Sequence, residues 1–171
     1  MKILFLFSST MFICVLTACN GSSSSRSATS KDSIGVTSAN HPVMDNGTLS
    51  KLGLPLSSNQ EVPVNNSTAT GSMDISYSKE NHFLKYTVRW DGLTDKPLMA
   101  HIHGTAAKGV NAGVRHDLTN VLTKATSGSF TDSVIVDGNM LKEDSLIKGF
   151  YYINIHTPAN QGGEIRGQIE F

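Results

Sequence analysis

The sequence has little cysteine, and this scarcity excludes one common source of stability. Of the 171 residues only Cys14 and Cys19 are cysteines, and both lie near the N-terminus. A domain formed by the rest of the chain therefore has no disulfide, although many small exported domains depend on one. Its stability has to come from a packed core.

An excess of charge of one sign is also lacking. Lys plus Arg and Asp plus Glu each number 14. A nucleic-acid-binding domain usually carries a strongly basic face, so this balance argues against nucleic acid as a partner. The chain has no Gly-x-Ser-x-Gly elbow to indicate a hydrolase. Asp91, Asp95 and Asp117 do not have the spacing of a Ca²⁺-binding loop.

The N-terminal apolar stretch is too short to be a typical membrane span. It extends from Ile3 to Leu16, is interrupted only by a Ser-Ser-Thr triplet, and follows the basic residue Lys2. A basic start followed by roughly 14 mostly apolar residues is typical of a secretory signal peptide. The pattern therefore predicts export from the cytoplasm.

The segment Leu16-Thr17-Ala18-Cys19 resembles the bacterial lipobox, in which the cysteine thiol is acylated and the peptidase cuts before it. We therefore predict a signal peptide over residues 1–18 and lipidation of Cys19, which anchors the protein in the cell envelope. The alternative is an ordinary signal peptide with an incidental cysteine. Asn20, in place of an aspartate, favours the outer membrane if the source has one, with the domain facing the periplasm or the cell surface.

Residues 19–48 are rich in Ser, Thr, Gly and Asn and contain few large apolar side chains. Such a segment buries too little surface to offset the entropy lost on ordering. We predict that it is a flexible tether between the lipidated Cys19 and a single domain at residues 49–171.

From about Leu49 onward, apolar and polar residues alternate with a period of two, which predicts β-strands. We expect about seven short strands, including residues 68–78, 83–90, 98–104, 127–136, 150–157 and the last residues to 171. One helix is expected over 139–148, capped by Asn139 and ended by Gly149. This pattern predicts an all-β fold with one short helix, either an antiparallel β-sandwich or a flattened Greek-key barrel.

The polar face of these strands carries the residues suited to metal chemistry. His101 and His103 are two apart on one expected strand, so both project from the same face. His156 lies on another strand, and Glu164 precedes the last. Imidazole and carboxylate groups suit zinc or copper. The predicted ligands are His101, His103, His156 and, as a candidate fourth, Glu164, with Asn154 and Arg166 orienting them by hydrogen bonds.

The same residues can also be explained by structural roles that need no metal. A His-x-His pair on a strand is often a surface or hydrogen-bonding feature. Glu164 and Arg166 could form a cross-strand ion pair, and His156 could bond a loop carbonyl.

Five blocks of the sequence resemble the CHRD domain, a module named after chordin and common in exported bacterial proteins. They are residues 60–63 (Gln-Glu-Val-Pro), 69–71 (Ala-Thr-Gly), 100–104 (Ala-His-Ile-His-Gly), 152–157 (Tyr-Ile-Asn-Ile-His-Thr) and 162–168 (Gly-Gly-Glu-Ile-Arg-Gly-Gln). The resemblance covers about residues 50–171. It implies a binding module, because the animal members belong to growth-factor-binding proteins, and no enzymatic activity is generally attached to the family. Val64 departs from the family, which often has a second proline there.

A fainter resemblance is to copper/zinc superoxide dismutase, which also has a His-x-His strand. It implies an immunoglobulin-like or dismutase-like arrangement, in which His101 and His103 match paired copper ligands and His156 a later one. The cysteine pair and the histidine-rich zinc loop of that family are missing, and the neighbours of His116 do not match its bridging ligand. Redox turnover is therefore not expected.

We thus interpret the chain as a lipid-anchored, non-enzymatic binding module of the cell envelope that holds copper or zinc. The first alternative is an adhesion or interaction domain for a protein or glycan, in which the histidines are structural. The second is an enzyme of the dismutase type, for which the sequence offers too few ligands.

Overall fold

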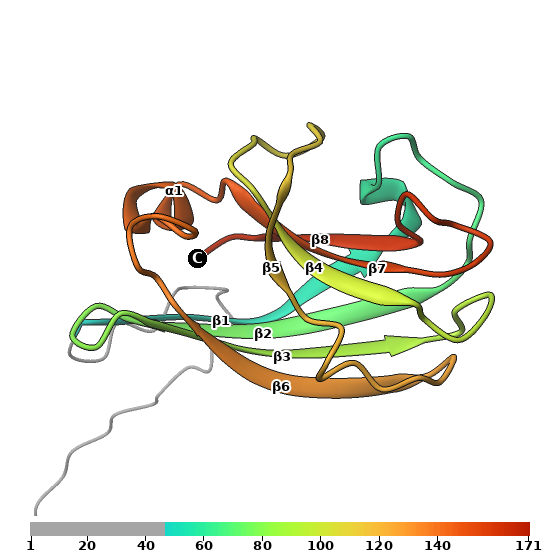
Figure 1. Ribbon diagram of the computed structural model, residues 1–171, viewed down its shortest axis with the longest axis horizontal. Coiled ribbons are helices and arrows are strands. Elements are labelled where there is room, and N and C mark those ends of the chain that lie inside the picture. Colours follow the sequence, from blue (N-terminus) through green and yellow to red (C-terminus); the bar gives the residue numbers. More distant parts are fainter. Residues whose placement is uncertain (1–46) are drawn as a thin grey trace, which may run out of the picture. The chain divides into compact units, whose positions relative to one another are not determined.

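Antiparallel strands make up most of the computed structural model, which describes residues 47–171 (Figure 1). The predicted signal peptide, Cys19 and the tether as far as residue 46 lie outside the described residues. The strands are β1 (Thr48–Ser57), β2 (Thr70–Ser78), β3 (Phe83–Asp91), β4 (Met99–Gly104), β5 (Val114–Asp117), β6 (Gly128–Ile135), β7 (Tyr151–His156) and β8 (Ile165–Ile169). The helices are the 3-10 helix η1 (Ser58–Gln60) and α1 (Glu143–Ile147).

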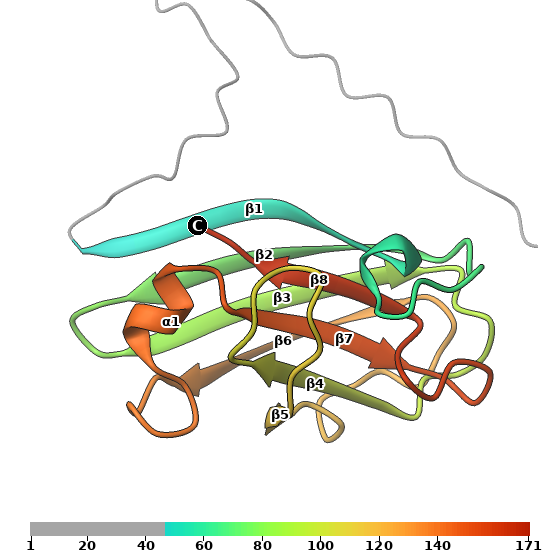
Figure 2. The ribbon, with the colours of Figure 1, turned by 90° about the horizontal axis from the view of Figure 1, so that it is seen from above.

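The eight strands form one curled sheet in the order β5-β4-β7-β8-β1-β2-β3-β6. Its two halves face each other as layers, with β1, β2, β3 and β6 opposite β4, β7 and β8 (Figures 1 and 2). Ser57 at the end of β1 pairs with Arg166 of β8 and joins the halves. This arrangement confirms the predicted all-β antiparallel fold, in the form of a curled half-barrel.

The core lies between the layers and is built by the period-two alternation of the strands. Leu84, Tyr86, Val88 and Trp90 of β3 are all buried. They are opposed by apolar residues of β4 and β7, including Ala100, Ile102, Ile153 and Ile155, which have no exposed surface. Burying each large apolar side chain contributes about 1.5–3 kcal/mol, and this burial stabilises a domain without a disulfide.

Two strands depart from the expected pattern. β4 begins at Met99, so Leu98 lies before the strand and is 45% exposed, whereas the alternation predicted an inward position. β5 has four residues, too few for a periodic signal, and the sequence did not predict it. Short edge strands of this kind form by pairing with a neighbour, which local sequence does not specify.

The helix is shorter than predicted, and Asn139 does not cap it. α1 begins after Lys142, and the Asp137 carboxylate instead accepts backbone N–H groups of Asn139, Met140 and Leu141 in a turn before the helix. Gly149 follows the helix with a φ of 71°, the left-handed conformation expected at its end. Within residues 47–171 no helix is both long and apolar enough to cross a membrane.

Candidate metal centre

The face of β4, β7 and β8 that points away from the core carries a grid of polar side chains. Register pairs His101 with Asn154 and His103 with Tyr152 across β4 and β7. It pairs Asn154 with Arg166 across β7 and β8. Because directly opposed residues share a face, these side chains lie side by side.

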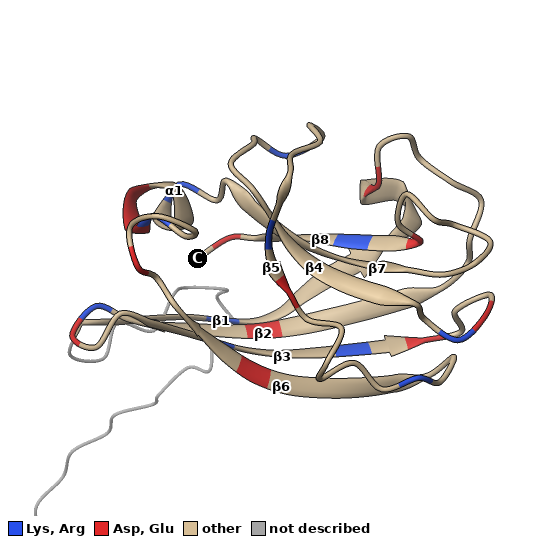
Figure 3. Ribbon diagram, in the orientation of Figure 1, with Lys and Arg blue, Asp and Glu red and all other residues tan. Residues whose placement is uncertain are grey.

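This polar face is buried, although the alternation alone predicted an outward position. The connection over residues 105–113 folds across it (Figure 1). Arg166 donates to the carbonyl of Val110, and Gln168 donates to that of Ala106. Every residue of β7 and β8 is consequently buried. Apart from Arg166 of β8, charged residues of both signs are spread over loops and other strands (Figure 3).

Three histidines converge on this face. One ligand nitrogen from each of His101, His103 and His156 lies within 4.8 Å of the others. Two come from alternate positions of β4 and the third from the neighbouring strand β7, so sheet register brings them together. The predicted histidine ligands are therefore adjacent in space.

Backbone carbonyls fix the tautomers of two of these rings. His103 Nδ1 lies 2.9 Å from the carbonyl oxygen of Ala112, and His156 Nδ1 lies 2.9 Å from that of Gln161. A carbonyl can only accept, so each Nδ1 carries the proton and each Nε2 is unprotonated, with a lone pair that can accept a hydrogen bond or bind a metal. The Nε2 atom of His103 is buried and has no hydrogen-bond partner. Such an arrangement is typical of metal-binding histidines, whose other nitrogen donates to a carbonyl or carboxylate.

The third ring, His101, bonds to a neighbouring histidine. Its Nδ1 lies 3.1 Å from His156 Nε2, and its Nε2 lies 3.9 Å from a carboxylate oxygen of Asp117. Because His156 Nε2 is an acceptor, His101 Nδ1 donates. A metal ion bound there would require the His101 proton to move to Nε2, where the Asp117 carboxylate can receive its hydrogen bond.

Burial lowers the pKa of all three imidazoles, which favours the neutral form that binds metals. Neighbouring imidazoles lower the pKa of His101 and His156 further. For His103 the Ala112 carbonyl and Asn154 partly oppose the effect of burial. Three neutral nitrogen donors, two of them oriented by carbonyls, fit copper or zinc.

Glu164, the predicted fourth ligand, is not in this group. It is fully buried, and its carboxylate accepts hydrogen bonds from the hydroxyls of Ser67, Thr94 and Thr157 and from the backbone N–H of Thr94. Burial acts to raise its pKa, but these donors outweigh that effect and lower it. The carboxylate therefore links the loops that precede β2, precede β4 and follow β7, and both of its oxygens are engaged by these donors.

Asn154 and Arg166, predicted to orient the ligands by hydrogen bonds, both act on His103, but in different ways. Asn154 lies between His103 and the buried Glu61 and interacts with both. The Arg166 guanidinium stands 3.4 Å above the ring of Tyr152, which stacks on His103 at 4.8 Å between centroids. Arg166 thus supports His103 through Tyr152. No ion pair between Glu164 and Arg166 is found in the described part of the chain.

Glu61 belongs to this region, and sequence reasoning did not single it out. It is 3% exposed, and burial raises its pKa to about 7 although Arg166, Asn154 and the backbone of Val62 lower it. Glu61 follows η1 in an irregular segment, where periodicity gives no information. The Gln-Glu-Val-Pro block, which contains Glu61, was the sequence signal that could have identified this residue.

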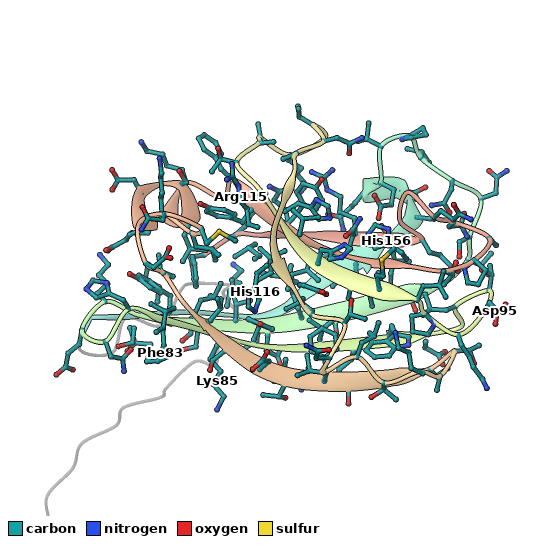
Figure 4. All side chains as sticks on the ribbon, viewed as in Figure 1. Phe83, Lys85, Asp95, Arg115, His116 and His156 are labelled. Carbon is teal, nitrogen blue, oxygen red and sulfur yellow. The ribbon has the colours of Figure 1, made fainter. Side chains whose placement is uncertain are left out.

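His116 does not join the group. It pairs with Ile102, a core residue, and therefore belongs to the opposite face from His101 and His103. Figure 4 shows His116 apart from His156.

The structure is thus an all-β domain with three adjacent imidazoles on one face of its sheet. The family model for the CHRD domain matches residues 52–169, and the chain belongs to the CHRD domain family. Comparison with curated proteins and with solved structures gave no significant match.

Proposed function

We propose that this protein is a lipid-anchored binding module of the cell envelope that holds one copper or zinc ion. The observation that carries the proposal is the convergence of His101, His103 and His156, whose ligand nitrogens lie within 4.8 Å. Membership of the CHRD family supports a binding role outside the cytoplasm.

The ligand atoms would be Nε2 of His103, Nε2 of His156 and Nδ1 of His101. The carbonyls of Ala112 and Gln161 hold two of the rings in the required orientation before any ion arrives. Preorganisation of this kind lowers the cost of ordering the ligands on binding. The bound ion would supply a fixed positive charge. The protein would hold the ion without catalysing a reaction.

Placement at the envelope rests on Cys19 and the residues around it. Lipidation there would hold the protein at a membrane, and the segment up to β1 would separate the domain from the lipid surface. The Ser- and Thr-rich composition of that segment suits such a spacer.

Metal content tests the central part of the proposal. The untagged protein is incubated with Cu²⁺ or Zn²⁺, dialysed and analysed by elemental mass spectrometry. We expect about one equivalent of metal in the wild type and a loss of most of it in the His101→Ala/His103→Ala double variant. His116→Ala is the matched control and should keep its metal, because His116 lies on the other face of the sheet. A folded wild type that retains no metal contradicts the proposal.

A non-metal interaction domain is the second candidate, favoured by an exposed apolar pair on the outer face. Phe83 and Ile135 oppose each other across β3 and β6, and they are 41% and 52% exposed. In that case the histidine substitutions would change stability without changing metal content. The metal measurement therefore separates the two candidates.

A further inference from the structure

Met99 is the first residue of β4 and lies on the histidine face. It is two residues before His101, so the two side chains project to the same side of the strand. It is also directly opposite His156 in the β4–β7 pair. The Cβ atoms of directly opposed residues are about 4.5–5.5 Å apart, and the methionine side chain has three rotatable bonds. The thioether is therefore within reach of the nitrogens of both histidines.

The other neighbouring donors are already engaged or lie outside the group. The Glu164 carboxylate is filled by hydroxyl and backbone donors. Asp117 is 62% exposed and faces the far nitrogen of His101. Met99 is 38% exposed, and His101, two residues further along β4, is partly exposed. Met99 is thus the one soft donor beside the three imidazoles among the described residues.

We propose that the Sδ atom of Met99 is the fourth donor to the ion held by His101, His103 and His156, and that the site therefore selects Cu(I). This inference rests on the proposed metal site. Thioether sulfur is a soft ligand that favours Cu(I), whereas zinc sites use imidazole, thiolate and carboxylate donors.

The charge of the donor set favours the same ion. Three imidazoles and a thioether bring no negative charge, which suits a monovalent ion better than a divalent one. The Arg166 cation over Tyr152 and the Asp117 carboxylate, 3.9 Å from the far nitrogen of His101, have opposite signs, so the selectivity rests on the donors themselves.

Competition titrations on the full protein test this selectivity. Cu(I) affinity is measured anaerobically against a chromogenic Cu(I) chelator, and Zn²⁺ affinity against a fluorescent zinc chelator. We expect Met99→Leu, which nearly conserves volume, to weaken Cu(I) binding by about tenfold or more and to change zinc binding by less than about twofold. Met140→Leu is the control, because Met140 is 50% exposed in the turn before α1. It should change neither affinity.

X-ray absorption at the copper edge gives a second readout that a purely structural role would not alter. The Cu(I) form of the wild type should show a sulfur neighbour, and the Met99→Leu form should show nitrogen neighbours alone. Equal Cu(I) affinity and identical spectra for the two proteins would overturn the role of Met99 but leave the histidine site intact. If the His101→Ala/His103→Ala variant kept both metals, or if the wild type bound neither, the site itself would be overturned.

Discussion

The Nδ1 atom of His101 lies 3.1 Å from the Nε2 atom of His156, although the two residues are 55 positions apart in the chain. The hydrogen bond between them links β4 to β7 on the polar face of the sheet. Since His156 Nδ1 already donates to Gln161, His101 must be the donor. A metal ion at this position would take the place of the Nδ1 proton, which would move to Nε2 of His101. Binding would depend on pH, because protons compete with the ion for the ligand nitrogens.

We expect metal retention to persist to more acidic pH than ordinary histidines would allow. Burial holds the pKa of each ligand imidazole below the usual 6.5, so protons compete for the ligand nitrogens only at lower pH. Metal content after dialysis should stay constant from about pH 7.5 to about pH 6.5 and fall below that range. Loss of half the metal above pH 6.5 would contradict this expectation.

Glu61 is expected to make the metal-free protein less stable as pH rises. Its folded-state pKa is about 7 against an ordinary value of 4.5, so the folded state binds the extra proton between these values. The contribution of this group to stability is fully present below pH 4.5 and is lost as pH rises through about 7. The loss amounts to about 3 kcal/mol. Urea unfolding with a chelator present, at several pH values, measures it.

Glu61→Gln is the matched variant, because the amide is neutral and close in shape. Relative to the wild type, it should gain about 3 kcal/mol of stability between about pH 4.5 and pH 8. The ligand histidines contribute a slope of opposite sign, but this contribution is common to both proteins and cancels in the difference. Parallel stability curves for the two proteins would show that Glu61 ionises normally.

Glu164→Ala should destabilise the domain without removing metal. The substitution leaves Ser67, Thr94 and Thr157 without their buried acceptor, at a cost of about 2–4 kcal/mol. The midpoint of urea unfolding should therefore fall, while the folded variant keeps about one equivalent of metal. A folded Glu164→Ala protein without metal would restore Glu164 as a ligand.

Cys19→Ala should abolish lipid attachment and release the protein from the membrane fraction. The thiol is the atom that the lipobox motif assigns to acylation, and the bound acyl chains supply the membrane affinity. Incorporation of labelled palmitate and cell fractionation measure the two effects. Cys14→Ala, within the apolar stretch, should behave like the wild type. Equal labelling of the two variants would exclude Cys19 as the anchor.

Much of the fold could be predicted because strand alternation is a local property. Leu84, Tyr86 and Val88 alternate with polar residues, so the sequence alone predicted their burial on one face of β3. The helix boundary was less predictable, because Asp137 accepts the N–H groups of Asn139 and Met140 in a turn, and the helix begins only after Lys142. β5 has too few residues to show any period.

The sequence by itself determined that His101 and His103 share a face, because side chains two apart on a strand point the same way. Only the tertiary structure decided that β7 lies beside β4 and places His156 against them. It also decided that residues 105–113 cover this face, that hydroxyl groups engage Glu164, and that Glu61 is buried nearby. These outcomes depend on strand order and loop closure, which bring together residues distant in the chain, and no local period encodes them.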